Sequence, residues 1–225
     1  SYMGAIQQMM MGTSAGATNI EDVFSAYTYT GNGATQTITN GIDLAGQGGL
    51  VVIKGRSSPS GTSGWGGVPN QFTWQDTTRG ITQTLISNAT NAAAGGGGFV
   101  SNSDISSTGF TLGYNGFNDF NYSANTYTSW TFREAAKFFD VVTYTGNGAN
   151  RTIAHSLGIA PGMILIKWTN DSADWFVYHR SLANTEYLVL NGIAAKATAA
   201  NAWNSTTADA STFSLGGHSN VNING

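Results

Sequence analysis

Apolar and polar residues alternate along several short stretches of the chain, which is the pattern expected of β-strands. Residues 121–132 alternate aromatic and small polar side chains, with Tyr127 and Trp130 among the aromatic ones. This segment is predicted to be a strand. Residues 24–30 and 139–145 are rich in aromatic, Val and Thr residues and are predicted to be strands as well. Short strands separated by Gly, Asn and Ser indicate an all-β chain.

Continuous apolar runs mark the strands that should lie deepest. Residues 50–53 and 163–168 are almost entirely apolar, which is typical of strands buried on both faces. Residues 187–190 are predicted to form another strand. Residues 92–98 and 193–202 are predicted to be connections, and the second contains enough Ala for one short helix.

The same pattern occurs twice in the chain. The string Thr-Tyr-Thr-Gly-Asn-Gly-Ala occupies residues 28–34 and again 143–149, and in both places Asn-Gly suits the left-handed positions of a tight hairpin turn. Gly-Leu-Val-Val-Ile-Lys at 49–54 corresponds to Gly-Met-Ile-Leu-Ile-Lys at 162–167. Further correspondences join Trp74 to Trp175, Arg79 to Arg180, and residues 108–113 to 211–216. Self-similarity of this kind predicts a tandem repeat of one domain.

The predicted fold is all-β, with two tandem antiparallel β-sandwich domains of the jelly-roll or lectin-like kind and a short N-terminal tail. The expected division is an anchoring tail at 1–22, a first sandwich at 23–136 and a second at 137–225. One composite sandwich built from both copies is the alternative. The segment at 133–137 is short and helix-prone, so the two domains are expected to be held nearly rigidly.

The second copy has no counterpart of the alternating segment at 121–132. A sandwich that lacks its last strand exposes an edge. We therefore expect either that the natural chain continues past Gly225 or that a neighbouring subunit supplies the strand.

Charge is sparse on this chain. Charged residues make up 9% and hydrophobic residues 40%, whereas about a quarter of the residues in ordinary soluble domains are charged. The surface must then be covered mainly by Thr, Ser, Asn, Gln and Gly, which suits faces that touch other copies, a particle or carbohydrate. The net charge is −3 and the basic residues are scattered, which argues against a nucleic-acid partner. No apolar run is long enough to predict membrane insertion.

Little in the sequence indicates catalysis or a cofactor. The chain has no Cys, and its three His residues have no companion at a metal-ligand spacing. Asp171 and Asp174 come nearest to a calcium loop but are predicted to lie in a solvated turn. The Gly run at 95–98 lacks the Lys-Ser/Thr of a phosphate loop, and there is no Gly-x-Ser-x-Gly elbow. We predict a protein that is not an enzyme and needs no metal or cofactor.

The two arginines that correspond in the repeat, Arg79 and Arg180, are expected to be structural donors to backbone or carboxylate.

An insertion in the first copy is the strongest candidate for recognition. The chain takes many more residues from Lys54 to Trp74 than from Lys167 to Trp175, and loops on rigid scaffolds often bind partners. Aromatic faces with short polar side chains suit sugars. The candidate glycan- or partner-binding residues are Trp65, Asn70, Gln71 and Trp74. The alternative is that the loop packs Trp65 against its own domain or a neighbour.

One long string resembles a known family. Residues 130–148, Trp-Thr-Phe-Arg-Glu-Ala-Ala-Lys-Phe-Phe-Asp-Val-Val-Thr-Tyr-Thr-Gly-Asn-Gly, are followed by Pro-Gly-Met-Ile-Leu-Ile-Lys at 161–167 and by Tyr-His-Arg at 178–180. Together they resemble a tandem β-domain of marine bacteriophage virion proteins that are labelled tail-fibre or appendage proteins. The resemblance covers nearly everything after Phe24. It implies a structural or host-attachment role on the surface of the phage particle and carries over no functional residue.

Partners follow from these expectations. Other virion proteins and a host-surface glycan are the candidate partners. A homo-oligomer, with a trimer favoured, is expected because the sparse charge and the unpaired end of the second copy leave surface for a neighbour. The alternatives to a tail-fibre subunit are a capsid decoration or head-fibre protein, and a carbohydrate-binding module or polysaccharide depolymerase.

The N-terminal tail is the candidate virion anchor. It is too apolar for a solvated linker and too short to fold alone, and methionine adapts to irregular apolar grooves. The candidate anchoring residues are Ile6, Met9, Met10 and Met11. A frayed terminus is the alternative.

Overall fold

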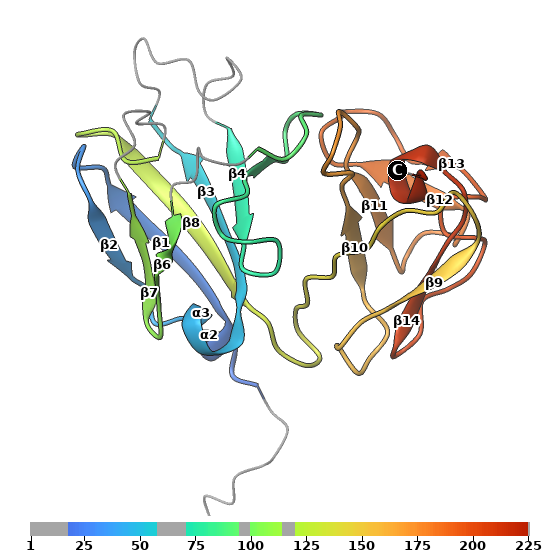
Figure 1. The fold of residues 1–225 in the computed structure, drawn as a ribbon, viewed down its shortest axis with the longest axis horizontal. Helices are drawn as coiled ribbons and strands as arrows, with labels where there is room; N and C mark the ends of the chain where they lie inside the picture. The colour runs from blue at the N-terminus through green and yellow to red at the C-terminus, as the bar shows by residue number, and fades with distance from the viewer. Residues whose placement is uncertain (1–17, 58–70, 95–99, 114–119, 225) are drawn as a thin grey trace, which may run out of the picture.

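The structure, a computed structural model, describes residues 18–57, 71–94, 100–113 and 120–224 (Figure 1). The first group of strands is β1 (Phe24–Thr30), β2 (Gln36–Thr39), β3 (Gly49–Gly55), β4 (Phe72–Asp76), β5 (Leu85–Ile86), β6 (Val100–Ser106), β7 (Gly109–Leu112) and β8 (Thr126–Arg133). The second is β9 (Arg151–Ala154), β10 (Met163–Ile166), β11 (Phe176–His179), β12 (Glu186–Val189), β13 (Ala197–Thr198) and β14 (Thr212–Leu215). Among the described residues there are three single turns of helix, α2 (Ile20–Val23), α3 (Leu44–Gln47) and α4 (Ser219–Asn222).

Each group of strands forms its own sandwich, and the two sandwiches lie side by side (Figure 1). In the first, a five-stranded sheet with the order β1-β8-β3-β4-β5 packs on a three-stranded sheet with the order β2-β7-β6. In the second, the sheets have the orders β10-β11-β12-β13 and β14-β9. The named strands pair antiparallel, so the prediction of an all-β antiparallel sandwich fold is confirmed. Within the described ranges, no sheet takes strands from both groups.

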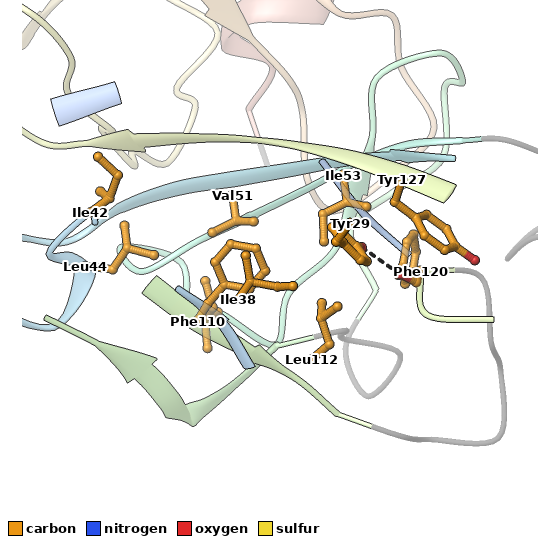
Figure 2. Close-up of a cluster of buried hydrophobic side chains, with 11 residues drawn as sticks. Tyr29, Ile38, Ile42, Leu44, Val51, Ile53, Phe110, Leu112, Phe120 and Tyr127 are labelled. Carbon is orange, nitrogen blue, oxygen red and sulfur yellow. Dashed lines mark hydrogen bonds between the residues drawn. The ribbon is translucent and has the colours of Figure 1, made fainter. Parts of the chain in front are cut away.

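The core of the first sandwich lies between its two sheets. Figure 2 shows Val51 and Ile53 of β3 on one side of this core and Phe110 and Leu112 of β7 on the other, all four fully buried. Leu50 and Val52 of β3 point the other way and are buried as well. Burying each such side chain stabilises the fold by about 1.5–3 kcal/mol. β3 is therefore covered on both faces, as its apolar run predicts.

The second sandwich has a separate core of the same kind. Ile166 and Phe176 come from one sheet, and Phe213 and Leu215 come from the other. Trp203 lies in this core with its indole N–H donating to the backbone oxygen of Glu186, 3.0 Å away. A buried indole of this size needs a hydrogen-bond acceptor, and the end of β12 provides it.

The prediction of a tight hairpin at Gly-Asn-Gly is wrong. β1 pairs with β8 and β2 pairs with β7, so the segment at 31–33 carries the chain from one sheet of the sandwich to the other. The left-handed positions are present, because Gly33 has φ +69° and its counterpart Gly148 has φ +68°. The turn is a corner between layers, and the corner is fixed by contacts from a distant part of the chain.

The connection between the sandwiches is not helical. Ala135 and Phe139 form a β-bridge, and Lys137 has φ +64°. Phe138 and Phe139 lie against Phe132, with ring centroids 6.4 and 5.3 Å away. The chain turns tightly to bring these two half-buried rings against Phe132, and this packing outweighs the modest helix propensity of Glu and Ala.

Two further expectations differ from the structure. Residues 193–202 contain β13 and turns, because Ala197 pairs with Tyr187 of β12. Residues 139–145 occupy the place that β1 has in the first sandwich but form no strand. The reason is the absence of a neighbour in the described structure, since β1 pairs only with β8 and the second sandwich has no strand at that place.

Candidate functional site

The predicted glycan-binding residues are only partly described. Trp65 and Asn70 lie outside the described residues. Gln71 is 6% exposed and directly precedes β4, and Trp74 is half-buried in that strand. The structure therefore does not place Gln71 on an open face, and the part of the glycan prediction that concerns the insertion loop stays a prediction.

Trp74 lies against the other sandwich. Its ring centroid is 5.3 Å from that of Trp175, with the planes tilted by 51°. This distance is within the range in which aromatic pairs stabilise each other by about 0.5–1.5 kcal/mol beyond the area they bury. Trp175 is 3% exposed. The two rings form the centre of a contact that we call the seam, which consists of Trp74, Ile86, Thr90, Ala93, Thr169, Ser172, Ala173 and Trp175.

Trp74 and Trp175 are contact partners, and they are not equivalent positions of the repeat. Ile53 of β3 is opposite Thr73 of β4, whereas the corresponding Ile166 of β10 is opposite Phe176 of β11. By this register the counterpart of Trp74 is Val177. The sequence-based pairing of the two tryptophans is therefore wrong by two residues, because equal spacing to an arginine can arise without equal register.

Four hydrogen bonds join the sandwiches across the seam. The indole N–H of Trp175 donates to the backbone oxygen of Ile86 over 2.9 Å, and both groups are buried. The backbone N–H of Ala173 donates to the oxygen of Thr90 over 2.9 Å, and that of Ala93 donates to the oxygen of Thr169 over 2.7 Å. The hydroxyl of Ser172 also lies 2.9 Å from that of Thr90. Directed bonds of this number fix the orientation of one sandwich on the other.

The lysine closest to the seam is used structurally. Burial lowers the pKa of Lys167 to about 8, while the carboxylates of Asp171 and Asp174 oppose the shift. A lysine with a lowered pKa is a candidate nucleophile. Here, however, the amine donates to the backbone oxygens of Trp168 over 2.6 Å and Asp171 over 3.2 Å, so it holds the turn that carries the seam.

The carboxylates of this turn also bind protein groups. Asp171 accepts from the N–H of Ser172 over 2.7 Å, and Asp174 accepts from the side-chain amide of Asn191 over 2.9 Å. In the part of the chain that the structure describes, no three His, Asp or Glu side chains are grouped as metal ligands would be.

The two arginines differ in their contacts. Arg79 pairs with Asp76, with its Nε 2.6 Å from Oδ2, and both side chains are nearly buried. The backbone N–H of Arg79 donates to the other carboxylate oxygen over 2.8 Å. Arg180 is exposed, and its backbone N–H donates to Gly162 over 3.0 Å. The structural role expected for Arg79 is therefore present, and Arg180 adds a backbone bond beside β10.

Two asparagines that the sequence reasoning missed fix the corners of the repeat. Asn222 accepts from the N–H of Asn147 over 3.0 Å and donates to the backbone oxygens of Ala149 over 2.6 Å and Gly216 over 3.0 Å. Asn121 makes the matching bonds to Asn32 and Ala34 in the first sandwich. The signal available in the sequence was an Asn a short distance after the repeated Phe-Thr/Ser-Leu-Gly string in each copy. The spacing differs between copies, which hides the match.

The candidate anchoring residues Ile6, Met9, Met10 and Met11 lie outside the described residues. Among the described helices, none has the length and apolar character needed to cross a membrane.

Comparisons with known proteins place the chain in a family without giving it an activity. Neither the curated proteins nor the solved structures include a match to this chain. One protein family matches residues 19–225, which cover both sandwiches and the seam between them. The chain therefore belongs to the family described as a domain of unknown function, DUF7483.

Proposed function

We propose that this chain is a non-enzymatic structural subunit of a bacteriophage virion, a tail-fibre or appendage protein that takes part in host attachment. The proposal draws on the resemblance of residues 130–148 and 161–167 to virion β-domains and on the sparse charge of the chain. The partners are other virion proteins, and the expected assembly is a homo-oligomer with a trimer favoured.

The observation that carries the proposal is the seam. Two sandwiches that are joined by buried hydrogen bonds and a tryptophan pair form a stiff unit. An appendage must transmit force and hold a fixed direction, so stiff coupling of tandem modules suits it, whereas a flexible linker would not.

The perturbed ionisable groups also support a structural role. Lys167 holds a turn, and Asp209, with its pKa lowered to about 2 by hydrogen bonds from Ser211 and Thr212, closes the loop before β14. Each of these groups spends its hydrogen bonds on the protein itself, which is the behaviour of scaffold residues.

Locating the chain on intact particles tests the proposal. Purified virions labelled with an antibody against the two sandwiches should show the protein by electron microscopy at the tail. Label on the capsid would instead make it a decoration or head fibre, which is the alternative. Absence of the chain from purified virions would refute both.

The anchoring role of the tail needs a second experiment. A chain that lacks residues 1–20 should keep its circular dichroism and thermal midpoint but should fail to enter particles. A chain in which Ile6, Met9, Met10 and Met11 are replaced by Ser is the matched control for length and should fail equally. Normal incorporation of both variants would show that the tail is not the anchor.

Glycan binding is best tested away from the seam. Trp74→Ala would disturb the contact with Trp175, so a loss of binding in that variant would be ambiguous. Trp65→Ala and Asn70→Ala on a glycan array address the insertion loop directly. Binding that is unchanged in both variants would count against a glycan site there.

A further inference from the structure

The second sandwich retains the frame of the first around one absent strand. Asn121 bonds to Asn32 and Ala34 as Asn222 bonds to Asn147 and Ala149, so residues 121 and 222 are equivalent positions. The hydroxyl of Tyr29 donates to the backbone oxygen of Phe120 over 2.6 Å, and that of Tyr144 donates to the oxygen of Val221 over 2.5 Å. The segment at 139–145 is therefore held where β1 lies in the first sandwich.

In the first sandwich this frame contains β8. β8 lies between β1 and β3 and pairs antiparallel with both over their whole length. Its pairing with β1 runs from Phe24 opposite Phe132 to Thr30 opposite Thr126. Its pairing with β3 begins at Gly49 opposite Arg133. Its inward residues are Tyr127, Ser129 and Thr131, all buried. The ring of Tyr127 stacks on that of Tyr29 with centroids 5.1 Å apart.

In the second sandwich both neighbours of that position have an unpaired edge. β10 pairs with β11 on one side and with no other described strand. Residues 140–145 make no described backbone–backbone hydrogen bond, and the oxygen of Thr145 accepts from the side chain of Arg151 over 2.6 Å. Met163, which corresponds to Leu50, is 57% exposed, whereas Leu50 is 4% exposed. Exposed edge groups and apolar side chains of this kind are a template for strand addition.

We propose that the space between residues 140–145 and β10, which we call the acceptor slot, binds an extended β-strand with the side-chain pattern of β8, running antiparallel to both neighbours. The occupant has an aromatic ring to stack on Tyr144, as Tyr127 stacks on Tyr29. It then has small hydroxyl residues facing the core, as at Ser129 and Thr131, and aromatic residues on the outer face. The inference stands independently of any role in a virion.

The geometry favours a strand that follows the Asn222 turn in the same polypeptide. In the first sandwich β8 begins shortly after the Asn121 corner. Because Asn222 fixes an equivalent corner, a strand attached there enters the acceptor slot with the direction and register of β8. A strand attached elsewhere would have to lose more chain entropy to reach the same place.

An added strand tests the proposal without removing any native contact. Residues 125–134 are copied and fused directly after Gly225. Amide exchange in 140–145 and 163–166 should slow by at least about tenfold, since these amides gain ladder partners, and the thermal midpoint of the second sandwich should rise. The control carries the same extension with Pro at the positions that copy Ser129 and Thr131, because proline cannot donate to a ladder.

The outcomes separate the alternatives. Slower exchange with the fused strand and not with the proline control supports the acceptor slot. Equal exchange in the two chains would overturn it. The same residues supplied as a free peptide to the unextended chain form a third arm, and protection by the peptide without protection by the fused strand would overturn the covalent route.

Discussion

At the scale of single residues, the side chains that matter most are small polar groups at corners. One carboxamide at Asn222 accepts from an N–H and donates to three oxygens at that corner. Neither a hydroxyl nor a carboxylate supplies one acceptor together with two donors in this geometry. This is why an asparagine is needed where a Ser- and Thr-rich chain offers many other polar residues.

Replacing Asn222 should destabilise the second sandwich in proportion to the bonds lost. Asn222→Ala leaves buried groups unpaired and should lower the unfolding free energy by about 1–3 kcal/mol. Asn222→Asp should cost more at neutral pH, because a carboxylate would face three oxygen acceptors, and part of the loss should return on acidification. Urea unfolding measures both variants. The exposed Asn150→Ala is the control and should change stability by no more than about 0.5 kcal/mol.

His218 should make the stability depend on pH. Its Nδ1 accepts from the N–H of Asn220 over 3.2 Å at the start of α4, its ring lies 4.7 Å from that of Phe176, and burial lowers its pKa. As the pH falls, His218 therefore takes up a proton in the unfolded chain, near pH 6.5, before it does so in the folded chain. The folded state loses stability as the pH falls below that value.

Urea unfolding at pH 7.5 and pH 5 measures this dependence. His218→Asn should flatten it, because asparagine caps a helix without titrating in this range. A slope that is unchanged in His218→Asn would contradict the assignment.

At the scale of elements, a strand exists where it has a neighbour. The segment at 139–145 has the composition of a strand, and its counterpart β1 is one, but pairing with β8 is what makes β1 a strand. The local pattern therefore predicted the elements that find partners, such as β3, β8 and β12. It could not show which layer follows the Gly-Asn-Gly corner or that two phenylalanines would bend the connection, because both depend on contacts far apart in the sequence.

The candidate site shows the same limit. Trp74 was singled out as an aromatic residue beside an insertion, and nothing in the local sequence indicates that its ring meets Trp175 in the other sandwich. The Asn121 and Asn222 corners were missed because their partners in the Gly-Asn-Gly-Ala segments are at least 73 residues away in sequence and their spacing from the repeated strings differs.

Gly146, the first glycine of the second corner, should be more sensitive to substitution by Ala than a left-handed glycine in an open position such as Gly158. A Cβ on Gly146 would overlap the backbone oxygen of Ile223, whereas a Cβ on Gly158 would meet nothing within 4 Å. Gly158→Ala should therefore cost only the conformational penalty of φ +69°, about 1–2 kcal/mol. Gly146→Ala should cost clearly more, because backbone must move. Thermal unfolding of the two variants side by side decides this, and equal midpoints would show that the corner tolerates a methyl group.

At the scale of the whole molecule, two sandwiches with separate cores behave as one body only through their contact. The clusters around Val51 and around Phe176 share no residue. The seam and the packing of Phe138 and Phe139 on Phe132 are what join them. The coupling that the proposed appendage role requires therefore depends on few side chains, and single substitutions can test it.

Trp175 should control whether the chain unfolds in one step. Trp175→Phe removes the donor to Ile86 and leaves a buried oxygen unpaired, at a cost of about 1–3 kcal/mol. Trp175→Ala also removes the ring beside Trp74 and should cost about 3–5 kcal/mol. Because each sandwich keeps its own core, calorimetry should show one transition for the parent chain and two for Trp175→Ala. Trp203→Phe is the matched control, since it loses an indole bond inside the second sandwich, to Glu186, and should lower stability without separating the transitions. A single transition in Trp175→Ala would mean that the packing at Phe132 couples the sandwiches without the seam.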